Sequence, residues 1–345
     1  MTTAMMKRLP AEWEPCEAIW LAWPHNIDTW PDRFAPIPAF FASWIHLICE
    51  SSPVRLLADE ATERAASKVL GNVLPTNLQI VPIKTNDCWI RDYGPAFVLD
   101  PQGKSVQAVD WKYNAWGGKY PPWDDDDAAA AKISQHLNID RSRSELCLEG
   151  GAIETDGNRR LLAFRHCLQC DRRNPLWTEN EIANELHRQL GVLEIVWIDG
   201  GGLVGDDTDG HIDQLARFVD PQNVVAAVCE DSTDANSVGL RRNYKQLQQW
   251  AKQTQPAATI HPLPIPPARS INDTRVPESY CNFLRIGPER MMVPQFGSAQ
   301  SDARAIGILK DLCPKVDVTG VDCRDLVWGL GALHCASLNQ PLCEP

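Results

Sequence analysis

The chain has 345 residues, with 33 basic and 45 acidic side chains, so its formal net charge is −12. Hydrophobic residues make up 44% and charged residues 23% of the sequence, which excludes a mostly disordered chain. The acidic balance argues against a nucleic-acid partner, because phosphate binding needs clustered Lys and Arg side chains. It is compatible with a cationic ligand.

Twelve cysteines are spread along the chain, too sparsely for a disulfide scaffold. No secretory signal is visible at the N-terminus. The longest uncharged apolar stretch, residues 35–49, contains two prolines and is too short to span a bilayer. We therefore expect a cytoplasmic protein with reduced thiols and no membrane association, in which one cysteine could serve as a nucleophile.

Short runs rich in Val, Ile and Leu predict β-strands, and the segments between them predict helices. In chain order, strands are expected at residues 54–58, 78–83, 96–99, 193–198, 223–228, 258–263, 291–293 and 316–318. Helices are expected at residues 38–50, 60–70, 127–137, 178–190, 236–252 and 301–312. The alternation indicates an α/β or α+β protein.

The chain contains no low-complexity linker. The Pro-rich residues 262–267 are the one boundary candidate, and we interpret them as a rigid loop. We therefore expect residues 1–345 to form a single domain. The helix at 178–190 opens with Thr178 followed three residues later by Glu181, which is the pattern of a capping box.

Five residues in turn-like segments, most of them rich in glycine, recur at similar intervals: Asp92, Glu149, His211, Asn282 and Cys335. The intervals between them are 57, 62, 71 and 53 residues (149−92, 211−149, 282−211 and 335−282). Glycine permits turns that present side chains at strand ends. The spacing suggests five similar units that each lend one loop to a common centre, although the sequence similarity between them is weak.

A cysteine, a histidine and several carboxylates far apart in sequence fit catalysis by a thiol nucleophile. Cys335 would attack as a thiolate, and His211 would move protons. Asp92 and Asp213 would hold a planar cation, because carboxylates match a guanidinium through paired hydrogen bonds. Glu149 would orient His211 and favour its charged form.

The acidic run from Asp206 to Asp213 has other interpretations. It could be a solvated loop or a site for a hard metal ion, although it lacks the spacing of a calcium loop. Cys167 and Cys170 form a single CxxC motif. We interpret it as structural, because a zinc site usually needs a second pair of ligands.

Two further side-chain types near these motifs have ordinary structural interpretations. His334 precedes Cys335 in sequence, so on a strand it would point to the opposite face, as a structural side chain. Most of the thirteen tryptophans are expected in the core. Trp89 and Trp116 lie in polar or Gly-rich contexts, where their faces would favour a cation or an alkyl chain.

Five motifs resemble those of a known family and occur in its order: residues 89–95 (WIRDYGP), 114–119 (NAWGGK), 149–151 (EGG), 208–213 (TDGHID) and 334–335 (HC). The family is that of the agmatine deiminases, also called Porphyromonas-type peptidyl-arginine deiminases, in the guanidine-modifying superfamily. The resemblance runs from residues 12–15 (EWEP) to 339–341 (NQP). It therefore covers essentially the whole chain.

The resemblance implies a five-bladed α/β propeller, the pentein fold, built of ββαβ units around a central active site. It implies hydrolysis of agmatine to N-carbamoylputrescine and ammonia through a covalent Cys amidino-thioether, a step of putrescine and polyamine biosynthesis. No metal or organic cofactor is implied. The implied roles are nucleophile for Cys335, general acid and base for His211, guanidinium clamp for Asp92 and Asp213, partner of His211 for Glu149, and substrate contact for Trp89. We expect Trp116 to be a second substrate contact because of its Gly-rich context.

The sequence departs from the family around the nucleophile. The family usually reads GGGNIHCITQQ, whereas residues 329–339 here read GLGALHCASLN. Leu330 stands in place of a Gly and Ala332 in place of the Asn, so the reaction type is better supported than the substrate.

Three alternatives therefore stay open. Free arginine or a peptidyl arginine could be the substrate, and a substrate carboxylate would want an Arg clamp, for which Arg159, Arg160 and Arg275 are available. From another class, the protein could depend on a metal bound by the Asp206–Asp213 cluster. A non-catalytic binding protein is disfavoured because every motif side chain is retained. The oligomeric state, including a homo-oligomer, is left open.

Overall fold

The computed structural model describes residues 6–71 and 73–343 of the chain. Its strands form six sheets, and five of these share one pattern of pairing. The first strand of each is antiparallel to the second, and the second is parallel to the third. A helical crossover joins each parallel pair, as such pairs require. Each sheet with its crossover is thus a ββαβ unit.

Four of these sheets use consecutive stretches of chain. They are β4 (Ala96–Leu99), β5 (Val106–Lys112) and β6 (Arg141–Cys147); β7 (Ile153–Thr155), β8 (Arg160–Phe164) and β9 (Glu194–Ile198); β10 (Ala216–Asp220), β11 (Asn223–Val228) and β12 (Thr259–Pro264); and β15 (Leu284–Ile286), β16 (Arg290–Gln295) and β17 (Asp317–Asp322). A two-stranded hairpin of β13 (Ser270–Ile271) and β14 (Thr274–Arg275) stands apart from them.

The fifth sheet joins the two ends of the chain. Its order is β18 (Leu338–Pro341), β1 (Cys16–Ala22), β2 (Val54–Leu57) and β3 (Leu78–Val81). Strand β18 pairs antiparallel with β1, with Trp20 opposite Leu338. The Trp20 indole also donates to Gln340 Oε1 at 2.8 Å. This pairing closes the ring of five units. The last strand, β18, completes the sheet that β1, β2 and β3 begin, so the segment around Cys335 belongs to that fifth unit.

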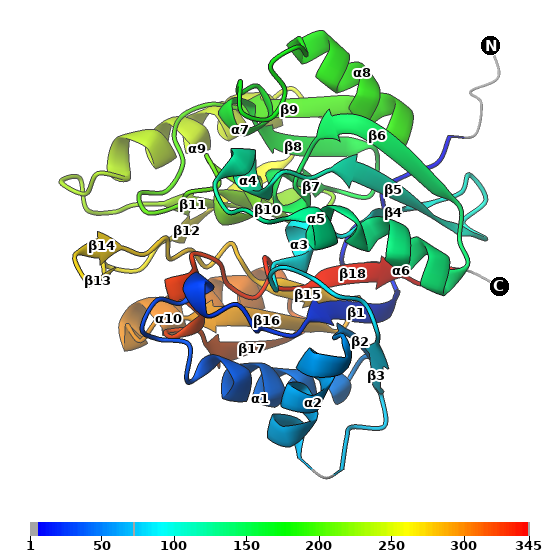
Figure 1. Cartoon of the computed structure of the whole chain (residues 1–345). Helices are drawn as coiled ribbons and strands as arrows, with labels where there is room; N and C mark the ends of the chain where they lie inside the picture. Colours follow the sequence, from blue (N-terminus) through cyan, green and yellow to red (C-terminus); the bar gives the residue numbers. More distant parts are fainter. Residues whose placement is uncertain (1–5, 72, 344–345) are drawn as a thin grey trace.

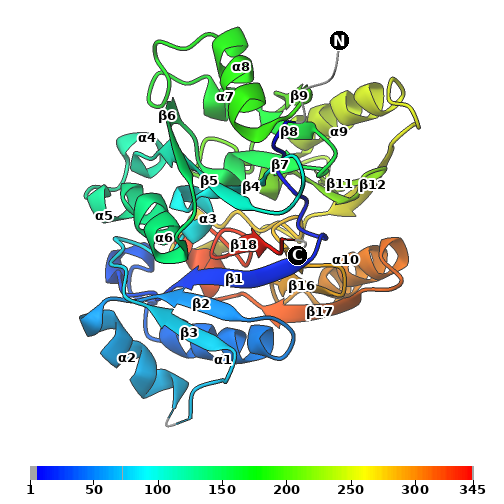
Figure 2. The ribbon, with the colours of Figure 1, turned by 90° about the vertical axis from the view of Figure 1, so that its right-hand side faces the viewer.

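The crossover helices lie on the outside of the sheets. They are α1 (Ile37–Cys49), α2 (Glu60–Leu70), α4 (Ala115–Gly118), α5 (Asp124–Asp127), α6 (Ala129–Leu137), α7 (Arg165–Leu168), α8 (Glu179–Leu190), α9 (Ser237–Ala251) and α10 (Ala299–Leu312). Figure 1 shows α8 and α9 at one side of the molecule and α1 and α2 at the opposite side. In the view turned by 90°, α10 lies beside β16 and β17 (Figure 2), and it contacts β17 and β12.

Four very short helical segments mark the approach to the first strands of the units. These are α3 (Ile90–Tyr93), η2 (Gly150–Ala152), η3 (Ile212–Gln214) and η4 (Leu326–Gly329), while η1 (Ile27–Thr29) lies outside this series. All five spaced residues, Asp92, Glu149, His211, Asn282 and Cys335, lie within five residues before a first strand: β4, β7, β10, β15 and β18. The expected even spacing therefore reflects one equivalent position in each unit.

Local chemistry explains the best-predicted helices. Thr178 accepts the backbone N–H of Glu181, and Glu181 accepts the backbone N–H of Thr178, so the expected capping box opens α8. Asp59 accepts the N–H of Thr62 at the start of α2, and both caps satisfy amides that a helix leaves unpaired.

The predicted strands and helices are all present, with ends shifted by up to four residues, but ten strands of the described part of the chain were missed. The missed strands are β1, β5, β6, β7, β8, β10, β13, β14, β15 and β18. Several have three residues or fewer, and β6 carries Arg141 and Arg143, which pair with Asp110. The interpretation of residues 262–267 as a loop was partly wrong. Pro262 to Pro264 complete β12, an edge strand that tolerates proline.

Within the described residues, none of the helices combines the length and hydropathy that a bilayer-spanning segment needs.

Candidate active site

Cys335 lies in the turn between η4 and β18 and is 6% exposed. Its Sγ is 3.1 Å from Asn282 Nδ2 and 3.5 Å from Asp213 Oδ2. Burial and the charges of Asp213 and Asp92 raise the pKa of this thiol well above its usual value. A reactive thiolate here therefore needs a compensating positive charge from a neighbour or a bound cation.

Asp92 and Asp213 are both buried beside this thiol. Among the described residues, Asp92 accepts hydrogen bonds from two neutral donors, the indole of Trp116 at 2.9 Å and the backbone N–H of Gly151 at 3.0 Å, and it lies 3.6 Å from His211. Burial raises its pKa to about 6, with the charge of Asp213 adding to the effect and that of His211 opposing it. Asp213 keeps one carboxylate oxygen, Oδ1, without a hydrogen-bond partner among the described residues. The pair is thus ready for a cation.

His211 is fully buried between two carboxylates. Its Nδ1 is 3.6 Å from Asp92 Oδ1, and its Nε2 is 3.8 Å from Glu149 Oε2. Burial works against the charged ring, yet Asp92 and the neighbouring Cys167 and Glu149 raise the pKa of His211 well above its usual value. The ring is therefore charged near neutral pH and can give up a proton.

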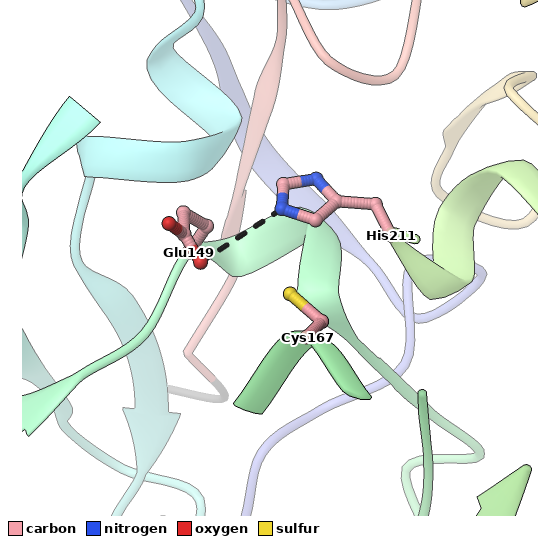
Figure 3. Close-up of side chains that lie close together, drawn as sticks. All are labelled: Glu149, Cys167 and His211. Atoms are coloured by element: carbon pink, nitrogen blue, oxygen red, sulfur yellow. Dashed lines mark ion pairs between the residues drawn. The ribbon is translucent and has the colours of Figure 1, made fainter. Parts of the chain in front are cut away.

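Glu149 owes its charge to Arg173, which is also buried. The Arg173 Nε lies 2.7 and 2.9 Å from the two carboxylate oxygens. Burial would raise the pKa of Glu149, but Arg173 and His211 hold it at about 2. Figure 3 shows Glu149 on one side of the imidazole and the sulfur of Cys167 pointing toward it from the short helix α7.

The expected placement of His334 on a strand, pointing away from Cys335, was wrong. Residues 333–336 form turns instead of a strand. The His334 Nδ1 is 2.7 Å from Asp213 Oδ2, and its Nε2 is 2.9 Å from Glu12 Oε1. Burial, Arg217 and Arg91 lower its pKa. Each contact nevertheless needs a proton, and both carboxyl pKa values are lowered, so we assign the charged ring.

A pocket of about 280 Å³ opens onto Cys335 and Asp92. Trp89, Trp116 and Leu330 line it, as expected for the two tryptophans. Trp116 and Leu330 have positive φ angles of 56° and 68°, a left-handed conformation that costs a side chain about 1–2 kcal/mol. The family glycine that Leu330 replaces would adopt this backbone freely, so the substitution keeps the turn and adds an apolar side chain to the wall.

The pocket is acidic. Asp28, Asp87 and Asp207 line it together with Asp92, and no Arg or Lys does so among the described residues. The three arginines that could have clamped a substrate carboxylate are engaged elsewhere. Arg159 donates to Gly191 O, Arg160 pairs with Glu194, and Arg275 pairs with Asp234.

The structure gives no support to a metal site in the Asp206–Asp213 cluster, because its carboxylates point to separate partners. Asp206 accepts a hydrogen bond from the backbone N–H of Thr208. Asp209 forms ion pairs with Lys119 and Arg173. Asp213 forms an ion pair with His334. Potential ligand atoms of Glu149, Cys167 and His211 do lie within 4.8 Å of one another. However, both oxygens of Glu149 already bind Arg173, and a divalent ion there would face that positive charge.

Several residues of the site lay beyond sequence reasoning. Glu12 accepts from Arg91 at 2.8 Å and from Arg217 at 2.7 Å, and Arg173 holds Glu149. No local pattern connects Glu12 with His334, which lies 322 residues further along the chain. Cys167 and Cys170 are free thiols. The structural interpretation of this CxxC motif did not include one feature of it, because Cys167 also packs beside His211.

Comparisons with known proteins agree with this geometry. The sequence profile described as "Porphyromonas-type peptidyl-arginine deiminase" matches residues 8–341. The chain is 34% identical to the agmatine deiminase of Stutzerimonas stutzeri, with 96% of this chain and 95% of the relative covered. It is 33% identical to the agmatine deiminase of Pseudomonas aeruginosa strain LESB58, with 97% and 95% covered.

Solved structures give the same result. An agmatine deiminase of Enterococcus faecalis, described as catalysing its reaction, superposes with a TM-score of 0.91 at 28% identity, over 97% of this chain and 96% of the other. A serine-for-cysteine variant of the agmatine deiminase of C. jejuni, described as having substrate bound, superposes with a TM-score of 0.88 at 27% identity, over 98% and 97%. An amidinotransferase of Microseira wollei shares the fold at a TM-score of 0.54 and 13% identity, over 98% and 99%.

The Glu149–Arg173 pair generates a stability prediction. Glu149→Gln removes one of the two carboxylates that pair with the buried guanidinium of Arg173, and Asp209 remains as the other. The variant should therefore lower the free energy of unfolding by up to about 3–5 kcal/mol. Urea denaturation measures this loss. The matched control is Glu230→Gln, which breaks an exposed pair with Arg304 and should cost about 0–1 kcal/mol. Equal losses in the two variants would contradict the role assigned to burial.

Proposed function

Because the chain belongs to the Porphyromonas-type peptidyl-arginine deiminase family, we propose that it is an agmatine deiminase, a hydrolase of the C–N bonds of a linear amidine. It hydrolyses agmatine to N-carbamoylputrescine and ammonia, a reaction that serves putrescine formation. One observation carries the proposal. The Cys335 thiol lies 3.5 Å from the Asp213 carboxylate, at a pocket whose lining contains four aspartates and no basic side chain among the described residues.

Asp92 and Asp213 would bind the guanidinium of the substrate. Paired hydrogen bonds from a planar guanidinium suit two carboxylates, and a partly unsatisfied buried pair gains most from them. The cation would also lower the thiol pKa, because it neutralises the charges that raise it. Substrate binding and nucleophile activation would therefore be one event, with Trp89 and Trp116 lining the approach.

The chemistry would follow in two halves. As the cation binds, the Cys335 thiol loses its proton to solvent. The thiolate then attacks the central guanidinium carbon and forms a C–S bond. The charged His211 gives a proton to one amino group, the C–N bond breaks, and ammonia leaves behind a cationic amidino-thioether. Neutral His211 then takes a proton from water, whose oxygen attacks the same carbon. The C–S bond breaks, the thiolate is restored, and the hydroxyl proton passes to solvent as the ureido C=O forms. Together with the ammonia released in the first half, this proton accounts for ammonium.

Glu149 would support both proton transfers. It lies 3.8 Å from the His211 ring, and its pKa of about 2 keeps it ionised throughout. The charge would favour the protonated ring before ammonia departs. Arg173, which holds Glu149 in place, would act through it.

The substrate tail is the feature that separates agmatine from arginine. Agmatine ends in an amine, whereas arginine adds a carboxylate next to its amine. The aspartates of the pocket would attract an amine and repel a carboxylate. Arg159, Arg160 and Arg275 are paired elsewhere, so the arginine and peptidyl-arginine alternative loses its proposed clamp.

We also propose that residues 1–345 form one propeller domain. The pairing of β18 with β1 and the contribution of one central residue by each unit support this. A cytoplasmic location is supported by the twelve free thiols. A homo-oligomer stays a prediction.

A panel of guanidines tests the function. Agmatine should give ureido product, with kcat/KM at least 100-fold above that for free arginine or a peptidyl arginine, as expected where a charged group is left unpaired. Cys335→Ala should abolish turnover, while Cys49→Ala, which removes a buried thiol at the end of α1, should leave it intact. Turnover retained in Cys335→Ala would refute the assigned nucleophile, and a preference for arginine would refute the substrate.

A second test concerns pH. Asp92 has a raised pKa of about 6, so its charge is present above that pH and is lost as the pH falls through it. Agmatine affinity of Cys335→Ser, measured by calorimetry, should be constant above about pH 6.5 and fall about tenfold per pH unit below pH 5.5. Asp92→Asn in the same background should bind weakly at every pH. Affinity unchanged between pH 7 and pH 5 would argue against the clamp.

A further inference from the structure

Four of the five equivalent positions before the first strands carry side chains with roles proposed above. The position before β15 carries Asn282, a fully buried amide. Asn282 donates from Nδ2 to the Sγ of Cys335 at 3.1 Å. It is the one side chain among the described residues that donates a hydrogen bond to this sulfur.

The orientation of the amide is set by its surroundings. Asn282 Oδ1 accepts the backbone N–H of His334 at 3.1 Å and approaches that of Cys335 at 3.4 Å. Both neighbours are donors, so the oxygen must face them and the NH₂ group must face the sulfur. The usual uncertainty in amide orientation is therefore absent here.

Asn282 is also held rigidly from behind. Arg217 Nη1 donates to the carbonyl oxygens of Cys281 at 3.2 Å and Phe283 at 3.0 Å, on either side of Asn282. Ser279 donates to Gln214 O and so ties the same segment to the turn that carries Asp213. The donor thus has a fixed position relative to both the thiol and the clamp.

A neutral donor has a specific advantage at this position. Asp213 and Asp92 are charged groups that raise the pKa of the Cys335 thiol, so both disfavour its thiolate form. A Lys or Arg in place of Asn282 would favour the thiolate, but it would also pair with these carboxylates and compete with the guanidinium. An amide stabilises sulfur charge and leaves the carboxylates free for the substrate.

We propose that Asn282 is a positioning residue that stabilises the thiolate form of Cys335 and aims its sulfur at the bound guanidinium carbon. This rests on the proposed role of Cys335 as nucleophile. The donor follows the sulfur through the reaction, because it can remain hydrogen-bonded to the thiolate that attacks and to the thiolate that leaves.

The test separates the donor from the acceptor of the amide. Asn282→Asp keeps an oxygen that can accept the His334 backbone N–H, but it replaces the donating NH₂ group with a second carboxylate oxygen. Asn282→Ala removes both the acceptor oxygen and the donating NH₂ group. The alkylation rate of Cys335 by iodoacetamide is followed against pH by mass spectrometry of its peptide, because the chain has twelve thiols. In both variants the alkylation profile should move to higher pH by at least one unit. The kcat for agmatine should fall at least tenfold, with KM changed less than threefold.

The matched control is Asn243→Ala. Asn243 is another buried amide, which binds Gly200 N and Gly201 O away from the thiol. This variant should leave the alkylation profile of Cys335 unchanged. Near-ultraviolet circular dichroism checks that each variant folds. If Asn282→Ala does not fold, Asn282→Ser, with its small polar side chain, takes its place.

An unchanged alkylation profile in folded Asn282→Asp and Asn282→Ser would overturn the proposal. So would a loss of activity that appears only in KM. Because iodoacetamide reacts without agmatine, a shifted profile in a protein that fails to hydrolyse agmatine would support the role of Asn282 while refuting the proposed function.

Discussion

Burial of carboxylates at the centre of the molecule is the constraint on which the site depends. An ionised carboxylate out of water needs a cation or several donors to remain charged. Glu149 has Arg173, and Glu12 has Arg91 and Arg217. Asp92 accepts hydrogen bonds from neutral donors, with His211 3.6 Å away, and Asp213 contacts His334 through one oxygen and leaves the other without a partner among the described residues. A guanidinium substrate would add a cation that hydrogen-bonds directly to both carboxylates, so the same contact would serve both binding and the activation of the thiol beside it.

The propeller makes this arrangement possible, because each unit brings its central side chain from the segment that precedes its own first strand. The short segments before the first strands place the side chains, and the sheets and outer helices hold them. Glu12, in the N-terminal segment, contacts His334 at 2.9 Å, in the turn that carries Cys335. The pairing of β1 with β18 keeps that segment beside the turn. The two ends of the chain therefore support the same site.

Those parts of the fold and of the candidate site that have a local sequence signal could be predicted from the sequence. The capping box of α8 and the similar spacing of Asp92, Glu149 and His211 are such signals. The first strands β7 and β15 were missed because three residues carry little periodicity. Glu12, Arg173 and His334 were missed as site residues because their partners lie far away in sequence, and only the closed ring brings them together. The fold and the agmatine deiminase relatives bear out the resemblance, while the roles of the individual side chains stay predictions.

The most direct test is to trap the covalent intermediate. The enzyme is mixed with agmatine, quenched in acid during turnover and digested. The mass of the peptide that contains Cys335 is then measured by mass spectrometry. We expect an added N-(4-aminobutyl)amidino group on Cys335, which is agmatine less ammonia, that disappears when agmatine is exhausted and never forms in Asp213→Asn. Continued formation of ureido product without any added mass on Cys335 would contradict it.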